Sequence, residues 1–443
     1  MVFKRKAYDT MLQWKEEQAG RTALLLKGAR RVGKTTLVRE FASREYRSHI
    51  LLDFARASRE VLHLFEDLSD LDDFFAKLQV LTHTQLHRRK SVIVMDEIQL
   101  FPPARQAVKY LVEDGRYDYI ETGSLLSIKK NTAGILIPSE ETRITLNPLD
   151  YEEFSDALGD SETCPMLREW FQKRKPLGEA VNRKIMRDFR NYMLVGGMPQ
   201  AVASYVETRN FQKVDQVKRG ILELYEDDFR KIDASGDVSR LFRNIPSELG
   251  KYASKYQISS VLNGKKWSDA ATRIGDLADS QTVNLAYHAD DPNVGMGLSR
   301  DPRRFKIYLA DTGLFTTLVF MDKSFTENVI YQKLLAGRLE ANLGFLYENM
   351  IAQMLQAKGE TLYYYTFPQE SSNHLYEVDF LLSRGNKLCP VEVKSSGYRT
   401  HASLDAFARK FSTRIQQKIL LYTKDLAKDH DILMLPVFMA MFL

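Results

Sequence analysis

The sequence predicts an α/β protein with several domains, on three observations. The 443 residues exceed the roughly 250–300 at which a single hydrophobic core stops growing. In the first 150 residues, short apolar runs alternate with amphipathic stretches, which is typical of a parallel sheet with helices on both faces. Apolar residues make up 44% and charged residues 27%, which excludes a disordered, collagen-like or disulfide-stapled chain.

The first predicted domain, residues 1–150, contains five apolar runs of strand length. Two stretches between them, 35–43 and 71–84, have helical periodicity. The runs are predicted to be buried parallel strands, at 23–26, 49–52, 91–95, 119–121 and 144–146.

The middle of the chain is predicted to be mainly helical. Residues 151–235 form a helical connector, interrupted at Gly196-Gly197-Met198-Pro199. Residues 236–325 are predicted to be a winged-helix-like domain: helical patterns at 238–256 and 267–288, including a helix at 267–277 and a turn into a second helix at 280–283, precede a strand at 307–309. The wing would face phosphates with Arg300, Arg303, Arg304 and Lys306. The alternative is a solvated loop beside a domain interface.

Residues 326–443 are predicted to be a second α/β domain. Its helices lie at 339–358 and 403–411, and its strands at 361–366, 376–382, 389–393 and 418–422. The apolar C-terminal run, 432–443, is too short for a bilayer-spanning helix of ~20 residues and contains Pro436. It is predicted to be a buried strand or a docked segment.

A phosphate-binding loop is the strongest motif. Residues 28–35, GARRVGKT, form a complete G-x-x-x-x-G-K-T between a predicted strand and a predicted helix. Backbone N–H groups would bind a polyphosphate, Lys34 would contact its β and γ phosphates during catalysis, and the Thr35 hydroxyl would bind Mg²⁺. The alternative is a strand-to-helix turn with chance glycines. The predicted nucleotide-binding residues are Gly28, Ala29, Arg30, Arg31, Val32, Gly33, Lys34, Thr35 and Thr36.

A second motif, Val92-Ile93-Val94-Met95-Asp96-Glu97, supplies carboxylates after an apolar strand. Asp96 is predicted to hold Mg²⁺, and Glu97 to polarise the water that attacks the γ-phosphate. The alternative is an Asp-Glu pair that only caps a strand. The sequence contains no Asn-Lys-x-Asp guanine signature, so ATP is the predicted nucleotide.

A third strand ends in Thr122-Gly123-Ser124. Ligands of doubly wound sheets lie beyond the carboxyl ends of the strands, so Thr122 or Ser124 is predicted to sense the γ-phosphate or the lytic water. We assign this catalytic role to Ser124. A plain strand-end turn explains the same residues.

Taken together, these motifs resemble those of prokaryotic AAA-type P-loop ATPases with a C-terminal DUF4143 domain. The matching segments are GARRVGKTT, VIVMDEIQ, TGS, LNPL with EEF, GGMP, KIYLADTGL and YEN. The resemblance implies an ATPase core with a catalytic glutamate, a helical and winged-helix middle, and a nuclease-like end. Because relatives of this class often complete their site with a neighbour's arginine, it also permits an oligomer.

The C-terminal domain contains a second constellation: Asp379, Glu392 and Lys394. If their strands form a hairpin, the two carboxylates can converge on one metal ion while Lys394 steadies the attacking hydroxide. The pattern is similar to the PD-(D/E)xK nucleases, restriction-endonuclease-like proteins in which a helical glutamate, here Glu348, often completes the site. The alternative is an exposed, charged hairpin.

These motifs predict an ATP- and Mg²⁺-dependent ATPase that acts on DNA through its C-terminal module. The net charge of +5, from 63 basic and 58 acidic residues, permits a nucleic-acid partner without requiring one. The alternative function is a nucleotide-switched platform for a partner protein, with a catalytically silent C-terminal domain. The two cysteines, Cys164 and Cys389, and the absence of a secretory signal predict a cytoplasmic protein with no membrane partner.

Overall fold

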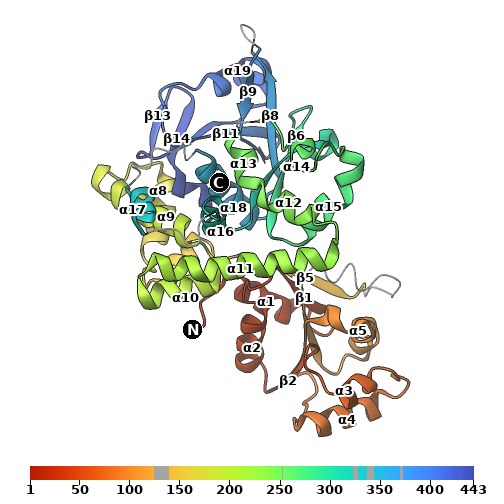
Figure 1. Cartoon of the computed structure of the whole chain (residues 1–443). Coiled ribbons are helices and arrows are strands. Elements are labelled where there is room, and N and C mark those ends of the chain that lie inside the picture. The colour runs from red at the N-terminus through yellow and green to blue at the C-terminus, as the bar shows by residue number, and fades with distance from the viewer. Residues whose placement is uncertain (124–138, 252, 323–327, 337–343, 370–372) are drawn as a thin grey trace. The chain divides into compact units, whose positions relative to one another are not determined.

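The computed structural model describes residues 1–123, 139–251, 253–322, 328–336, 344–369 and 373–443, and Ser124 lies outside them. The chain divides into two compact units (Figure 1). Unit 1 comprises residues 1–147 and 279–281, and unit 2 comprises residues 148–278 and 282–443. In the described part of the chain, no helix is both long and apolar enough to cross a membrane.

Unit 1 is built on a five-stranded sheet in the order β2-β3-β4-β1-β5. Every neighbouring pair is parallel, which confirms the predicted α/β class. Each of the five predicted runs overlaps one of these strands, although β5 begins and ends earlier than predicted. The strands are β1 (Ala23–Lys27), β2 (Ser48–Asp53), β3 (Ser91–Asp96), β4 (Asp118–Gly123) and β5 (Glu141–Thr145).

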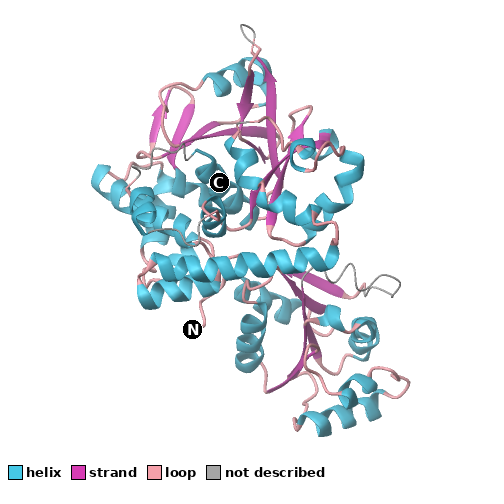
Figure 2. Ribbon diagram, viewed as in Figure 1, coloured by secondary structure: helices cyan, strands magenta, loops and turns pink. Residues whose placement is uncertain are grey.

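Helices cover both faces of this sheet (Figure 2). On one face, Leu24 and Leu26 pack with α1 and α2; on the other, Ala23 and Leu25 pack with α3, α4 and α5. Strands buried on both faces must be apolar at successive positions, which explains why they appear as short continuous runs in the sequence. The helices are α1 (Lys6–Glu17), α2 (Lys34–Glu45), α3 (Arg59–Leu64), α4 (Leu71–Thr82) and α5 (Pro102–Asp114).

Local sequence sets several helix ends in unit 1. The Asp70 carboxylate caps α4 by accepting from the backbone N–H groups of Asp72 and Asp73. Pro102 begins α5, where its missing N–H is not needed, and Gly115 ends that helix with φ +68°. These residues set where the two helices begin and where α5 ends.

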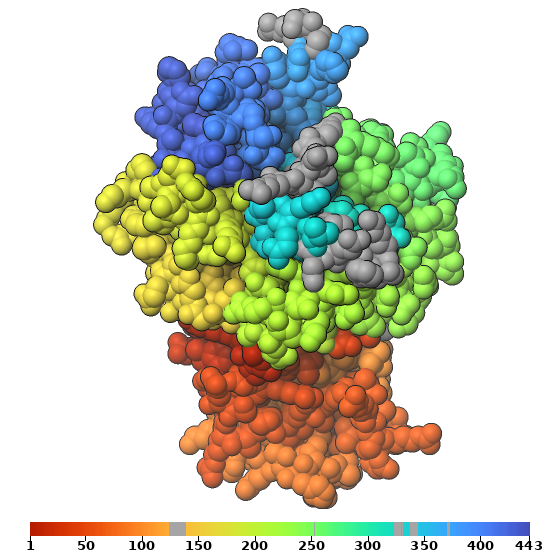
Figure 3. Space-filling view, turned by 60° about the vertical axis from the view of Figure 1, so that its left-hand side comes forward, coloured from red at the N-terminus to blue at the C-terminus, as the bar shows by residue number. Residues whose placement is uncertain are grey.

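Unit 2 contains most of the helices. Segments far apart in its sequence pack together: residues 150–200, yellow, lie against residues 373–443, blue (Figure 3). The Leu177 N–H, for example, donates to Asp425 Oδ1 at 2.9 Å. Residues 151–235 are helical, as their periodicity predicts, while their role as a connector between domains stays a prediction. Their helices are α7 (Tyr151–Ala157), α8 (Thr163–Lys173), α9 (Glu179–Val195), α10 (Pro199–Thr208) and α11 (Phe211–Ile232).

The remaining helices of unit 2 follow in chain order. They are α12 (Asp237–Arg243), α13 (Ile245–Gly250), α14 (Ile258–Val261), α15 (Trp267–Asp279), α16 (Thr312–Val319), α17 (Asn328–Leu335), α18 (Gly344–Ala357) and α19 (Ala402–Phe411).

Unit 2 also contains two sheets. The four-stranded sheet has the order β7-β6-β8-β9, and the mixed five-stranded sheet has the order β10-β11-β12-β14-β13. The C-terminal run forms β14 and a buried 3₁₀ helix, Val437–Phe442, as predicted. The strands are β6 (Val283–Ala289), β7 (Arg300–Leu309), β8 (Leu362–Pro368), β9 (Leu375–Val378), β10 (Phe380–Arg384), β11 (Lys387–Lys394), β12 (Lys418–Tyr422), β13 (Ala427–Asp429) and β14 (Ile432–Pro436).

The prediction of a second helix in the winged-helix-like region is wrong. The segment that follows α15 forms strand β6, which lies between β7 and β8 and pairs with both. β6 is mostly buried, and long-range pairing on both sides favours a strand there over the helix that local periodicity suggests. The four-stranded sheet joins strands from either side of the predicted boundary at 325/326, and the four-domain division stays a prediction.

The Gly196-Gly197 motif packs against the Asp311-Thr312-Gly313 motif. Asp311 Oδ2 accepts from the Gly197 N–H at 2.6 Å, and Asp311 Oδ1 accepts from the Leu314 N–H at 2.8 Å. A Cβ on Gly313 would lie 2.4 Å from the Val195 carbonyl oxygen, so this approach requires glycine. The two motifs therefore have a clear packing role.

A fully buried lysine, Lys218, forms hydrogen bonds with the backbone in the same region. Its Nζ donates to the Leu194 carbonyl at 2.7 Å and to the Gly313 carbonyl at 3.1 Å. Burial lowers the pKa of Lys218 to about 8, against the opposing effect of Asp215 and Asp311. The ammonium thus links α11 by hydrogen bonds to the backbone at Leu194 and at Gly313.

We expect Lys218 to make stability pH-dependent in a defined window. Between about pH 8 and the ordinary lysine pKa near 10.4, the unfolded chain holds a proton that the folded chain has lost, so this group stabilises the fold as pH rises. The unfolding free energy of the wild type, relative to Lys218→Met, should increase by up to about 1.4 kcal/mol per pH unit there. Urea unfolding of both proteins across the window measures this; a constant difference would contradict it.

Candidate functional site

The phosphate-binding loop joins β1 to α2, as predicted. A Cβ on Gly28 would lie 2.5 Å from the Leu146 carbonyl oxygen, so the backbone requires glycine there. Gly33, with φ +99°, precedes the first residue of α2. Ala29 and Val32 are buried, whereas Arg30, Arg31 and Thr36 are exposed. The loop therefore presents backbone N–H groups at the start of a helix, where an anion is stabilised.

Lys34 is the first residue of α2, and only 7% of it is exposed. Its Nζ donates to the carbonyl oxygens of Gly28 and Ala29, at 2.9 and 3.0 Å. Burial lowers the pKa of Lys34, while the carboxylates of Glu97 and Asp96 oppose that shift. The ammonium thus lies directly against the loop that would hold phosphates.

Thr35 and Asp96 meet at the carboxyl ends of the strands. The Thr35 hydroxyl donates to Asp96 Oδ1 at 3.0 Å, and the Thr122 hydroxyl donates to the same oxygen. This contact is possible because β4 lies beside β3, with Met95 paired to Glu121. Hydroxyl and carboxylate oxygens are the ligands that Mg²⁺ prefers, so this set fits a magnesium ion.

Glu97 follows β3 in a left-handed conformation, with φ +55°. Its N–H donates to the Thr122 hydroxyl at 3.2 Å, and its carboxylate accepts from the Gln99 amide. Left-handed backbone in a residue other than glycine is costly and clusters at functional sites. The structure thus holds the Glu97 carboxylate one residue beyond the Asp96 that would bind the metal.

Gln99 is a site residue that the sequence analysis missed. It is buried in the 3₁₀ turn Ile98–Leu100, and its amide fixes the carboxylate predicted to act on water. The signal was a polar residue in an otherwise apolar stretch two positions after Glu97. Thr122 takes a central place, between Asp96 and the backbone of Glu97, while the structure does not describe Ser124.

A buried ionic cluster lies on the opposite face of the same sheet. Arg105 on α5 pairs with Glu121 on β4 and Glu141 on β5. Burial raises the pKa of Glu121 to about 7, and the Arg105 guanidinium opposes this rise. Because adjacent strand residues point to opposite faces, Glu121 does not face the phosphate loop although Thr122 does. The cluster ties α5 to two strands of the sheet.

The C-terminal constellation lies in unit 2. Glu348 is on α18, Asp379 separates β9 from β10, and Glu392 and Lys394 are on β11. Asp379 Oδ2 accepts from the Val393 N–H at 2.7 Å, and Lys394 Nζ lies 3.1 Å from Glu392 Oε1. The antiparallel β10–β11 pair places Asp379 beside the end of β11, as expected of a hairpin. Burial raises the pKa of Asp379, Glu348 and Glu392.

Two further residues belong to this region. Lys306 on β7 pairs with Glu377 on β9, and its Nζ lies 3.8 Å from Glu348 Oε2. The expectation that Lys306 lies on an exposed wing is therefore wrong, because its position on β7 turns it into the interior. Arg304 donates a hydrogen bond to the Thr366 hydroxyl at 2.8 Å, whereas Arg300 and Arg303 are exposed.

The C-terminal carboxylates do not form a ready metal cage. Among the residues that the structure describes, no three His, Cys, Asp or Glu side chains are grouped so that they could hold a metal ion. Each of the three predicted ligands already has a protein partner: a lysine for Glu392, a backbone N–H for Asp379, and Lys306 for Glu348.

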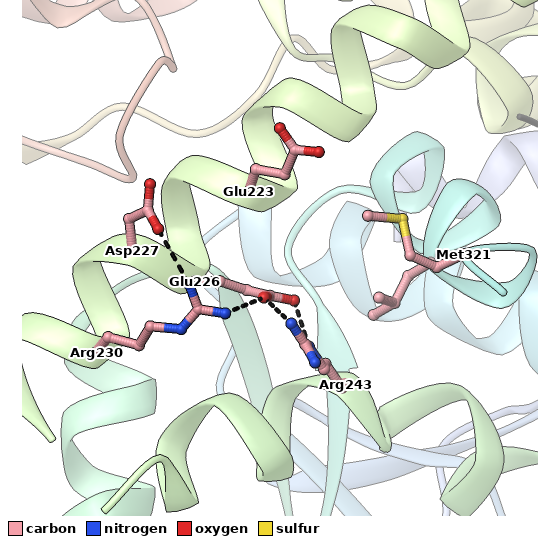
Figure 4. A pocket seen from close by; sticks show the side chains of 7 residues that line it. Glu223, Glu226, Asp227, Arg230, Arg243 and Met321 are labelled. Carbon is pink, nitrogen blue, oxygen red and sulfur yellow. Dashed lines mark hydrogen bonds and ion pairs between the residues drawn. The ribbon is translucent and has the colours of Figure 1, made fainter. Parts of the chain in front are cut away.

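A pocket of about 660 Å³ lies elsewhere in unit 2 (Figure 4). Arg230 and Arg243 both point toward Glu226, which lies 3.5 Å from Arg230 and accepts from Arg243 Nε at 2.5 Å. Arg230 also lies 3.4 Å from Asp227. Glu226 and Asp227 are thus already paired with arginines of the pocket lining.

Three family models match separate parts of the chain. Residues 20–155 match AAA_14, described as an AAA domain. Residues 343–438 match DUF4143, and residues 186–324 match DUF8612; both are described as domains of unknown function. The chain thus combines an AAA domain with a C-terminal DUF4143 domain, as the motifs suggested. No curated protein matches it.

Several solved structures show a remote likeness. The ORC1 protein of Aeropyrum pernix in complex with DNA is 12% identical, covers 76% of this chain and 93% of its own, and has a TM-score of 0.31. The RuvB Holliday junction branch migration motor of Thermotoga maritima is 14% identical, with 63% and 89% covered and a TM-score of 0.28. PCH-2 of C. elegans is 12% identical, with 46% and 60% covered and a TM-score of 0.25. Likenesses at this level carry no functional conclusion.

Proposed function

We propose that unit 1 binds ATP with Mg²⁺ and hydrolyses it to ADP and phosphate. The observation that carries the proposal is the set of contacts linking Thr35, Asp96, Thr122 and Glu97 beside the phosphate-binding loop. The AAA domain match over the same residues supports it.

Each residue has a distinct role in this proposal. Backbone N–H groups of residues 29–36 bind phosphate oxygens, and Lys34 exchanges its two carbonyl acceptors for the β and γ phosphates. When bound through Thr35 and Asp96, Mg²⁺ neutralises phosphate charge. Glu97 accepts a proton from the attacking water, with Gln99 orienting its carboxylate. Thr122 and Ser124 are proposed to detect the γ-phosphate.

The test of nucleotide binding is Lys34→Ala. Loss of the ammonium should weaken ATP binding at least about tenfold, since a charged hydrogen bond contributes about 1.5–3 kcal/mol. Titration with a fluorescent ATP analogue measures this. The control is Lys77→Ala, an exposed lysine of α4 that pairs with Asp73 on the same helix. Unchanged ATP affinity and hydrolysis in Lys34→Ala would refute the proposal.

We further propose that the ATP cycle changes how unit 2 engages DNA. The winged-helix-like part would be residues 236–325, and the restriction-endonuclease-like part residues 326–443. Helices α12 to α15 followed by the antiparallel β6–β7 pair support the first assignment, with Arg300 and Arg303 exposed at the start of β7.

Salt dependence tests the DNA proposal. If Arg300 and Arg303 contact two phosphates, replacing both by Ala should reduce the slope of log affinity against log salt by roughly 2. Fluorescence anisotropy of labelled duplex DNA, with ATP and with ADP, measures both the slope and its nucleotide dependence. Arg183→Ala, an exposed arginine of α9, is the control. Equal slopes in all three proteins would contradict the proposed interface.

A second candidate is a nucleotide-switched platform that a partner protein reads. The observation favouring it is that the predicted C-terminal ligands are already paired with protein groups. In either case, association of several chains would allow a neighbour's arginine to reach the phosphates. ATP-dependent recruitment of a protein with no DNA binding would favour this candidate.

A further inference from the structure

Carboxylates from separate segments lie near one buried lysine of unit 2, Lys306 on β7. Its Nζ pairs with Glu377 of β9 and lies 3.8 Å from Oε2 of Glu348 on α18. Asp379, between β9 and β10, also acts on Lys306 electrostatically, whereas Glu392 pairs with Lys394. Only 7% of the Lys306 side chain is exposed, so the ammonium has exchanged water for these acidic partners.

The two ion pairs join Lys306 to carboxylates from other segments of the chain. A buried charge without a partner is strongly destabilising, so Lys306 and the carboxylates depend on each other. The ammonium also lies over the Tyr364 ring, with Nζ 5.5 Å from the ring centroid.

The other charged groups of the C-terminal site also have protein partners. Lys394 pairs with Glu392 Oε1 and also donates to the Thr400 carbonyl, and Asp379 accepts from a backbone N–H. Glu392 Oε2 is buried and has no hydrogen-bond partner in the part of the chain described. Mg²⁺ is usually bound through one or two carboxylates and several waters. Here the two candidate carboxylates, Glu392 and Asp379, each already have a protein partner on one oxygen.

We propose that Lys306 is the resident cation of the C-terminal carboxylate site, in the place that a divalent metal would otherwise take, and that unit 2 engages its partner without metal-dependent cleavage. Lys306 lies in the DUF8612 match, whereas the carboxylates lie in the DUF4143 match. The site is therefore completed by a residue from outside the domain that contains its acids. This inference refines the C-terminal half of the proposed function and does not require ATP hydrolysis.

The experiment is a Mn²⁺ titration of the full chain without nucleotide, followed by calorimetry and by melting temperature. The variants are Asp379→Asn, Lys306→Met and the double variant, with Asp96→Asn as the control for metal bound at the phosphate loop. Any Mn²⁺ that the wild type binds should also be bound by Asp379→Asn. Lys306→Met should melt lower without metal and gain one Mn²⁺ site. Saturating that site about 100-fold over its Kd should raise the melting temperature by roughly 5 °C.

Each outcome of these titrations either supports or contradicts the proposal. Loss of the gained site in the double variant would support the proposal. A wild-type Mn²⁺ site that survives Asp96→Asn but is lost in Asp379→Asn would overturn it, as would Mn²⁺-dependent DNA cleavage lost in Asp379→Asn. A folded Lys306→Met that gains no site would overturn the role of Lys306. If Lys306→Met does not fold, the wild-type and Asp379→Asn titrations decide the question. ATP hydrolysis, measured separately, reports on the proposed function.

Discussion

Replacing Glu97 by Gln should lower the rate of ATP hydrolysis by at least about 100-fold while leaving ATP affinity within a few-fold of the wild type. The amide keeps the size of the side chain but cannot accept a proton from water, and general-base catalysis typically contributes 10²–10⁴-fold. The phosphate loop, Lys34 and Thr35 are unchanged by this substitution. Binding and hydrolysis should therefore separate.

Single-turnover hydrolysis of radiolabelled ATP, together with equilibrium binding of the same nucleotide, measures both quantities. Glu113→Gln provides a matched control, because Glu113 is an exposed carboxylate on α5 of the same unit. Wild-type hydrolysis by Glu97→Gln would remove Glu97 from the mechanism. Parallel losses of binding and hydrolysis would instead assign it a structural role.

The phosphate site was predictable because its parts are local or lie at strand ends. Residues 28–36 are contiguous, and their loop geometry depends on glycines that the sequence shows directly. Asp96 and Glu97 follow a strand, and parallel strands bring their carboxyl ends to one edge, so convergence with Thr35 follows from topology. Gln99 was missed because its contact with the Glu97 carboxylate depends on the left-handed conformation of Glu97, which the residue types do not predict.

The errors in unit 2 have a different cause. The segment after α15 carries apolar residues that suit a helix or a strand, and pairing with β8, almost 80 residues later, selects the strand. Lys306 lies among arginines in sequence, which suggested a surface wing. Its burial depends on acids from α18 and β9, and such long-range partners leave no local pattern. The basic stretch is thus divided between an interior ion pair and an exposed edge.

The largest effect on stability is expected from Gly197→Ala. A Cβ at this position would lie 2.1 Å from the Leu149 carbonyl oxygen and 2.6 Å from the Leu149 nitrogen. Both are backbone atoms, and the Leu149 N–H already donates to the Gly197 carbonyl at 2.7 Å, so neither segment can move without breaking that bond. The Gly197 N–H is also held by Asp311, which is buried.

We therefore expect Gly197→Ala to lower the free energy of unfolding of unit 2 by at least about 3 kcal/mol, the upper range for overpacking a tight site. Gly220→Ala is the matched control, because Gly220 lies within α11 and a Cβ there would meet nothing within 4 Å. That substitution should instead stabilise the protein by roughly 0.5–1 kcal/mol through helix propensity. Urea unfolding followed by circular dichroism compares the two, and equal stabilities would contradict the close packing of the Gly196-Gly197 motif against Leu149.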